Sequence, residues 1–336
     1  MRSGETKGEH VALEVTTVGS YPRPPEEGGE FRLRKTLQAL DRGEATPDDV
    51  RAAEDALTGE ILAEQADAGV DLVTDGQVRW DDPLTRVAEG LDGFAISGLI
   101  RFFDNNTYFR QPVVKGPVRR EAPILVDEFS FARDHSTRPV KAVLCGPYTL
   151  AALSSDEHYR DRAALLADLA AALRDEARDL ATAGATVIQF DEPALARVPG
   201  QPAGDLAALA AVAGTLVDGV DASTVLATYF GDVVPLGSAL FDLPFDGFGL
   251  DLVAGPQSAE LLEALPSEKR LQAGVVDARN TRVETADDVA RVVGDLAESV
   301  SLERLSLSPS CGLEFLPREA ARRKLERLAE VKERVS

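Results

Sequence analysis

The chain alternates short apolar segments with longer amphipathic ones over nearly its whole length. The short segments are rich in Val, Ile, Leu and Phe and end abruptly at Gly, Pro or an acid, which is typical of strands buried in a parallel sheet. Such segments are expected to be strands at residues 11–18, 70–74, 140–145, 187–190, 224–228, 247–250, 271–276 and 304–308.

The longer segments repeat their apolar positions every three or four residues, which predicts helices that bury one face. Thr46 marks the clearest start, because it is followed by Pro47 and two acids and so supplies an N-cap, a first-turn proline and favourable first-turn charges. Helices are expected at residues 31–40, 47–68, 159–182, 205–217, 258–265, 286–300 and 318–335.

This alternation predicts an α/β fold, specifically a (β/α)8 TIM barrel. No linker interrupts the pattern, so residues 1–336 are expected to form a single domain. The polar residues 1–10 are expected to be a flexible tail.

One stretch, residues 91–116, has too few strong helix formers to be a barrel helix. Its aromatic residues, Phe102, Phe103, Tyr108 and Phe109, alternate with polar ones as they would in a hairpin. We therefore expect a hairpin-like excursion inserted after the second strand.

The predicted strands end on chemically active side chains. They are Ser20, Asp75, Gln77, Tyr148, Asp191, Glu192, Tyr229, Asp251, Asp277, Arg279 and Cys311. A parallel barrel places the loops after its strands on one face, where crowded acids raise one another's pKa at a cost that a cationic ligand, a metal or catalysis usually balances. This predicts an enzyme with Asp191 at its centre, although Asp191 as a simple helix cap is the alternative.

The chain is strongly acidic, with a formal net charge of −21. This charge argues against nucleic acid and anionic membranes as partners. The acids are spread along the chain, as in an acidic proteome or an ordinary acidic enzyme. Its two cysteines fit a reducing compartment, and no apolar stretch approaches the ~18 residues of a membrane span. We expect a soluble, cytoplasmic protein.

The chain resembles the cobalamin-independent methionine synthase family over nearly its whole length. The resemblance is carried by TTVGSYP at residues 16–22, LDGFA at 91–95, GPYT at 146–149, QFDEPAL at 189–195, AGVVD at 273–277 and SPSCGL at 308–313. It implies transfer of a methyl group from 5-methyltetrahydrofolate to the thiolate of homocysteine, which zinc activates by lowering the pKa of the thiol.

The resemblance also implies roles for individual residues. Ser20 and Asp191 match positions that hold the carboxylate and the amino group of homocysteine, and Gln77 stands where a Glu normally helps to hold that amino group. We expect substrate contacts from Glu192 as well. Ser20 as a plain turn hydroxyl remains open.

Two further residues, Tyr229 and Asp277, are expected to be catalytic together with Asp191. Arg34 and Lys35 match a basic segment that contacts the anionic polyglutamate tail of folate, and a solvated basic helix face is the alternative.

The zinc ligands of the family are only partly present. The corresponding positions read Ala227, Tyr229, Asp251 and Cys311, so Cys311 is retained and Asp251 is a shortened acid. Two ligands fall short of the three or four that a zinc site needs. We expect this chain alone to have an incomplete zinc site.

Other stretches resemble the first, metal-free barrel of the full-length family members. They are FRLRKT at 31–36, TYFGD at 228–232, GLDLV at 249–253 and GVVDARN at 274–280. Our hypothesis is therefore a methyltransferase that works with a separately encoded zinc-bearing homologue. The alternatives are a non-catalytic folate-binding or docking partner of that homologue, and an alkyl transferase acting on another thiol or a corrinoid donor.

Overall fold

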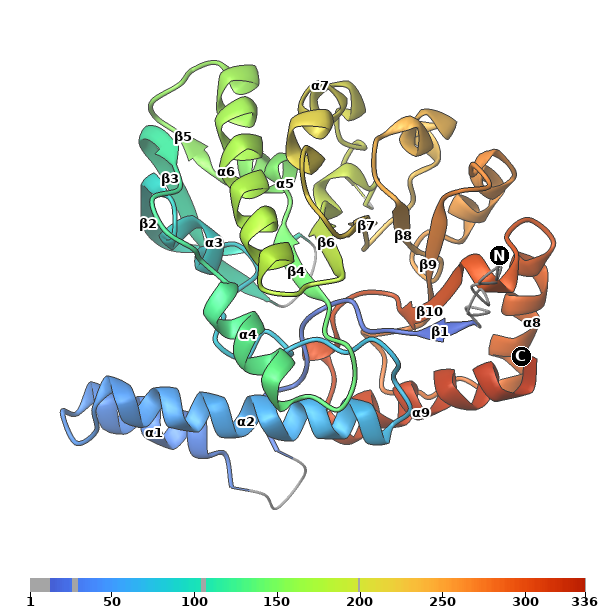
Figure 1. Ribbon diagram of the computed structural model, residues 1–336, viewed down its shortest axis with the longest axis horizontal. Coiled ribbons are helices and arrows are strands. Elements are labelled where there is room, and N and C mark those ends of the chain that lie inside the picture. Colours follow the sequence, from blue (N-terminus) through green and yellow to red (C-terminus); the bar gives the residue numbers. More distant parts are fainter. Residues whose placement is uncertain (1–12, 26–29, 104–106, 199, 336) are drawn as a thin grey trace, which may run out of the picture.

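Parallel strands form the main sheet of the protein (Figure 1). The computed structural model describes residues 13–335 apart from 26–29, 104–106 and 199, so the expected tail at residues 1–10 lies outside the described residues. The strands follow the order β1-β10-β9-β8-β7-β6-β4, and every neighbouring pair is parallel. Their bounds are β1 (Glu14–Val15), β4 (Ala142–Cys145), β6 (Val187–Asp191), β7 (Ser223–Thr228), β8 (Gly247–Asp251), β9 (Arg270–Val276) and β10 (Leu305–Pro309).

Residues 70–74 close this sheet into a barrel. They form isolated parallel bridges, Thr16 with Leu72 on one side and Val73 with Val140 on the other. The predicted barrel is therefore confirmed. The second predicted strand, however, is present only as bridges, because this segment pairs with each neighbour at few positions.

Helices occupy connections between the strands and cover the outside of the barrel (Figure 1). Their bounds are α1 (Arg32–Asp41), α2 (Pro47–Asp67), α3 (Thr85–Glu89), α4 (Val126–His135), α5 (Pro147–Leu153), α6 (Arg162–Thr182), α7 (Leu206–Val217), α8 (Ala286–Ala297) and α9 (Arg318–Val335). None of the helices in the described part of the chain is long and apolar enough to cross a membrane.

The helix expected at residues 258–265 differs from the prediction. It is the 3-10 helix η4 (Pro256–Ala264), in which only Ser258 and Leu262 are buried. The connection after β7 likewise contains the 3-10 helices η2 (Val234–Leu236) and η3 (Ser238–Asp242). With so few buried residues in η4, packing does not favour a regular α-helix over the tighter 3-10 turns there.

The expected hairpin is confirmed. Strands β2 (Asp92–Arg101) and β3 (Tyr108–Arg119) pair antiparallel, and β5 (Ser155–Asp156) pairs parallel with β3. Phe102 and Phe109 are buried, whereas Tyr108 is exposed. The excursion therefore packs aromatic side chains against the rest of the protein and presents its other side to solvent.

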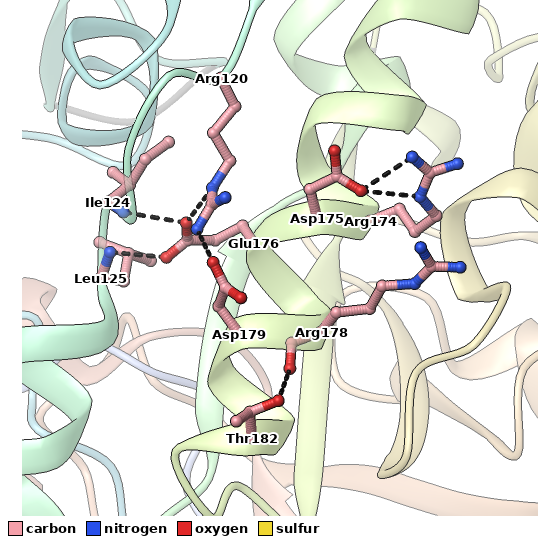
Figure 2. A network of polar contacts seen from close by, with 9 residues as sticks. All are labelled: Arg120, Ile124, Leu125, Arg174, Asp175, Glu176, Arg178, Asp179 and Thr182. Carbon is pink, nitrogen blue, oxygen red and sulfur yellow. Dashed lines mark hydrogen bonds and ion pairs between the residues drawn. The ribbon is translucent and has the colours of Figure 1, made fainter.

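A buried ion-pair network ties this excursion to the barrel (Figure 2). Glu176 on α6 is fully buried and accepts the backbone N–H groups of Ile124 and Leu125 at 2.9 and 2.7 Å. Arg120, directly after β3, donates to Glu176 at 2.6 Å and to Asp179 at 2.5 Å. The end of the hairpin and the start of α4 are therefore held against α6.

Candidate active site

A pocket opens at the carboxyl ends of the barrel strands. It encloses about 460 Å³ of space, including its open mouth. Its polar wall comes from residues that follow or end different strands. They include Ser20, Gln77, Cys145, Asp191, Tyr229 and Glu314. The barrel thus brings four of the predicted site residues together with two, Cys145 and Glu314, that the sequence did not single out as site residues.

Asp191 is the last residue of β6 and is only 9% exposed. Its Oδ1 accepts a hydrogen bond from Nε2 of Gln189 at 2.6 Å, and its Oδ2 accepts one from the Tyr229 hydroxyl at 3.2 Å. Burial raises the pKa of Asp191 to about 7, against the opposing effects of these hydrogen bonds and of the Lys141 charge. A carboxyl group in this state can pair with a ligand cation at neutral pH, and the cation would lower its pKa.

Ser20 and Glu314 form a second polar pair in the pocket. The Ser20 hydroxyl donates to Oε2 of Glu314, which lies in the 3-10 helix η6 (Leu313–Phe315) after β10. Burial raises the pKa of Glu314, and the hydrogen bond from Ser20 and the charge of Arg23 oppose this rise. The segments that follow the first and last strands of the barrel therefore meet at this pair.

Gln77 reaches the pocket from a tight turn after residues 70–74. Gln77 has a φ of +52° and Gly76 a φ of +70°, a region that costs a non-glycine residue energy. Asp75 stabilises the turn by accepting the Gln77 N–H at 2.9 Å. A Cβ at Gly19 would lie 3.1 Å from Nε2 of Gln77, so glycine at this position leaves room for the Gln77 side chain.

Aromatic side chains form the apolar wall of the pocket. Trp80, Phe102 and Phe230 line it, and the rings of Phe102 and Phe230 meet edge to face with centroids 5.8 Å apart. The Trp80 indole donates to the buried Glu128 at 3.1 Å, which fixes its orientation. Such a wall suits a flat or apolar ligand group beside the polar cluster.

Glu192 follows Asp191 but faces elsewhere. It is fully buried, and its oxygens accept the N–H groups of Tyr148 at 2.8 Å and Thr149 at 2.6 Å, in the first turn of α5. Burial raises its pKa to about 7, although these hydrogen bonds oppose the rise. Glu192 is thus placed to hold the start of α5 and has no exposed surface for a substrate.

Five other predicted residues also lie outside the pocket wall, namely Asp277, Arg34, Lys35, Asp251 and Cys311. Asp277 follows β9, and its Oδ1 accepts the N–H of Arg279 at 2.9 Å. Arg34 and Lys35 are exposed on α1, where Lys35 forms an ion pair with Glu30 at 2.8 Å.

The carboxylate of Asp251 accepts hydrogen bonds from backbone N–H groups. Its Oδ2 accepts the N–H of Phe230 at 3.0 Å, and its Oδ1 accepts those of Val253 and Ala254 at 3.0 and 2.8 Å. Burial raises its pKa to about 6, and these three hydrogen bonds oppose the rise. The carboxylate therefore shapes the loop after β8 instead of facing a metal.

Cys311 has no exposed surface, and burial raises the pKa of its thiol. Within the described residues, no group of three or more His, Cys, Asp or Glu side chains is arranged to hold a metal ion. The residues present at the family's zinc positions therefore do not fit a zinc site in this arrangement.

Comparisons with known proteins agree with one another. A family described as "Cobalamin-independent synthase, Catalytic domain" matches residues 13–334. A methionine synthase of Saccharolobus solfataricus is 34% identical over 320 residues, which cover 95% of this chain and 93% of that protein. A methionine synthase of Sulfurisphaera tokodaii is 33% identical over 315 residues, which cover 93% and 89%.

The fold has close counterparts among solved structures. A B12-independent methionine synthase from Shewanella sp. W3-18-1, in complex with selenomethionine, superimposes with a TM-score of 0.81 at 25% identity, covering 96% of this chain and 98% of that one. The corresponding protein of Listeria monocytogenes has a TM-score of 0.76 at 20% identity, covering 97% and 98%, and shows the same fold.

Proposed function

The chain belongs to the cobalamin-independent methionine synthase family, and on this premise we propose that it is a methyltransferase of methionine biosynthesis. The acceptor is homocysteine and the donor is a 5-methyltetrahydrofolate-type molecule. In the reaction, the homocysteine sulfur attacks the methyl carbon, the bond between this carbon and N5 of the donor breaks, and N5 keeps the electron pair and takes up a proton. The sulfur loses its own proton before the attack.

The observation that carries this proposal is the placement of Asp191 in a pocket whose other lining residues, apart from Glu314, are neutral. Homocysteine has an α-ammonium group, and a buried carboxylate at a strand end pairs well with such a cation. Ser20 and Gln77 line the same cavity and can hydrogen-bond the α-carboxylate or the ammonium. Trp80 and Phe230 give the apolar surface that a pterin ring and a thioalkyl chain need.

The family resemblance implies a zinc ion that would activate the thiol, and the described residues do not fit one. We therefore propose that a separately encoded, zinc-bearing homologous barrel works with this chain and would supply this ion. The residues of this chain bind and orient the amino acid and the donor, and the enclosed pocket limits access of water.

The exposed Arg34 and Lys35 on α1 are proposed to attract the anionic tail of the donor. Lys35 is already paired with Glu30 in an exposed ion pair, and such pairs contribute little stability. A polyanionic ligand would therefore compete with Glu30 at low cost.

Methionine formation from homocysteine and the triglutamate form of 5-methyltetrahydrofolate tests the proposal. We expect activity when the chain is mixed with the zinc-bearing homologue, and a loss of at least 100-fold with Asp191→Asn. Asp127→Asn is the matched control, because Asp127 is exposed on α4, outside the pocket wall, and its replacement should leave the rate within about twofold. Equal losses with both variants would contradict the assignment of the pocket.

A non-catalytic partner role is the second candidate, and the internally bonded Asp251 favours it. In that case the chain would raise the activity of the homologue in a one-to-one complex, and Asp191→Asn would have no effect on the rate. If the acceptor is a thiol other than homocysteine, the assay would give no methionine with homocysteine. It would give a methylated product when that other thiol is supplied instead.

A further inference from the structure

A lysine is buried inside the barrel. Lys141 directly precedes β4 and is only 2% exposed. Its Nζ donates to the Thr17 carbonyl at 2.6 Å and to the side-chain oxygens of Gln189 at 2.7 Å and Gln272 at 2.8 Å. A buried ammonium is costly unless each of its N–H bonds is satisfied. Here each N–H has an oxygen acceptor, and the acceptors come from β6, from β9 and from the segment that follows β1.

The lysine fixes the direction of the Gln189 amide. An ammonium only donates hydrogen bonds, so the amide atom that faces Lys141 is the oxygen. The NH₂ group must then point away, where it donates to the Val18 carbonyl at 2.7 Å and to Oδ1 of Asp191 at 2.6 Å. Both amide hydrogens are used, so Gln189 has no freedom to present its oxygen to Asp191.

This arrangement links the buried lysine to the pocket. Oδ1 of Asp191 is held by Gln189, while Oδ2 faces Tyr229, which lines the pocket. The positive charge of Lys141 lowers the pKa of Asp191 against the dominant effect of burial. The titratable and charged groups that act on Asp191 are Lys141, Tyr229, Glu314, Glu192 and Cys145. Lys141 is the basic group among them. Burial lowers the pKa of Lys141 to about 7, and the charges of Asp191 and Glu14 oppose this fall, so the Lys141 ammonium and the Asp191 carboxylate stabilise each other.

We propose that Lys141 and Gln189 are positioning residues, which hold Asp191 in one orientation and keep it a carboxylate for the ammonium group of an amino-acid ligand. The proposal rests on the function proposed above, since it specifies how the pocket recognises the amino group of its substrate. Lys141 acts through Gln189 and through its charge, and it does not line the pocket itself.

A ligand-free titration tests the electrostatic part. Carbon-13 NMR of the aspartate carboxyl groups, with Asp191→Asn to assign the signal, gives the pKa of Asp191 directly. Lys141→Met is expected to raise this pKa by at least 1 unit, since it removes the cation. Gln272→Met is the matched control: it removes another partner of Lys141 and leaves the contact between Gln189 and Asp191 in place. It should shift the pKa by less than about 0.3 units.

Ligand binding tests the positioning part. We expect Lys141→Met and Gln189→Met to weaken homocysteine binding at pH 7 at least tenfold, with partial recovery at pH 8.5 for Lys141→Met. Binding of 4-mercaptobutanoate, which lacks the amino group, should change less than twofold. In an Asp191→Asn background, Lys141→Met should have no further effect on homocysteine binding. Circular dichroism at each pH confirms that the variants are folded.

The outcomes separate the two proposals. An unchanged pKa of Asp191 in Lys141→Met would overturn the electrostatic link between Lys141 and Asp191, whether or not homocysteine binds. Equal losses for homocysteine and for 4-mercaptobutanoate would also overturn it, because they would indicate a general defect of the pocket. Absence of homocysteine binding to the wild-type chain, together with a raised pKa in Lys141→Met, would contradict the proposed function and support the link between Lys141 and Asp191. If Lys141→Met does not fold, the binding of homocysteine and of 4-mercaptobutanoate is compared in Gln189→Met instead.

Discussion

The Tyr229 hydroxyl donates a hydrogen bond to Oδ2 of Asp191 over 3.2 Å. This contact joins the residue after β7 to the last residue of β6, and it lowers the pKa of a carboxyl group that burial raises to about 7. Tyr229→Phe removes the donor and keeps the ring. We therefore expect the pKa of Asp191 to rise and homocysteine binding to weaken about three- to tenfold at pH 7, with a smaller loss at pH 8.5.

Calorimetric titration of homocysteine at both pH values measures this effect. Tyr108→Phe is the control, because Tyr108 is 57% exposed on the hairpin and its replacement should leave binding unchanged. A loss in Tyr229→Phe that is the same at pH 7 and pH 8.5 would mean that Tyr229 acts by contact with the ligand and not through the charge of Asp191.

The raised pKa of Asp191 also predicts how stability depends on pH. In the unfolded chain this group titrates near about 3.9, and in the folded chain near 7. The folded state thus binds the proton more tightly, so the contribution of Asp191 to stability falls as pH rises from about 4 to 7. Asp191→Asn cannot ionise, and its melting temperature should rise relative to wild type across this range, by the equivalent of roughly 2–4 kcal/mol.

Asp288 provides a control of opposite sign. A hydrogen bond from Thr285 and an ion pair with Arg291 lower its pKa, so its contribution to stability is present at neutral pH and is lost as pH falls. Asp288→Asn should therefore be less stable than wild type at pH 7 and equal to it in acid. Thermal unfolding at pH 5 and pH 8 measures the stability of both variants relative to wild type. The assignment for Asp191 would be contradicted if Asp191→Asn and Asp288→Asn changed the stability in the same direction.

The network in Figure 2 predicts a large effect on stability. Glu176→Ala leaves the guanidinium of Arg120 with one carboxylate partner and leaves two buried backbone N–H groups without an acceptor, so we expect a loss of about 3–5 kcal/mol. Arg174→Ala on the same helix breaks a partly exposed pair with Asp175 and should cost less than about 1 kcal/mol. Urea denaturation measures both, and similar midpoints for the two variants would contradict the role given to Glu176.

The sequence predicted the barrel because its signals are local. Buried strands, their abrupt ends and the amphipathic helices between them can each be recognised within a few residues. Since parallel strands of a closed barrel end on one face, Ser20, Asp191 and Tyr229 could be placed near one another without knowledge of any contact. The weakest prediction concerned residues 258–265, where too few buried positions favoured a regular helix.

The side of the strand to which a residue points was harder to predict. Asp191 and Glu192 are adjacent, and successive side chains of a strand alternate in direction. Asp191 therefore faces the barrel pocket, and Glu192 faces the amides of α5. The alternation of side chains along a strand could therefore have predicted from the sequence that these two acids have different roles. Glu314 was missed because it lies in η6, three residues beyond Cys311, and a 3-10 helix of three residues is too short for periodicity to indicate which side chains turn inward.

Zinc binding is the sharpest remaining test of how this chain works. We expect no tight one-to-one binding of zinc to the purified chain, with or without homocysteine, because Asp251 accepts three backbone N–H groups and the thiol of Cys311 is fully buried. Competition with a chromophoric chelator measures the affinity. Cys311→Ser should leave the result unchanged, as should the control Cys145→Ser. Tight binding that is lost in Cys311→Ser alone would contradict this prediction.

Restoring the missing ligands tests the same point from the opposite direction. Ala227 is in β7 and Tyr229 directly follows that strand, so the double variant Ala227→His, Tyr229→Cys introduces a His-x-Cys pair at its end. Together with Cys311 these side chains would supply three ligands of the types that zinc prefers. We expect the affinity for zinc to rise at least 100-fold over wild type, and Cys311→Ser in this background to reverse most of the gain. A double variant that binds zinc no better than wild type would mean that Cys311 cannot leave its buried position. The substitutions at positions 227 and 229 would then not be enough to explain why the described residues do not fit zinc.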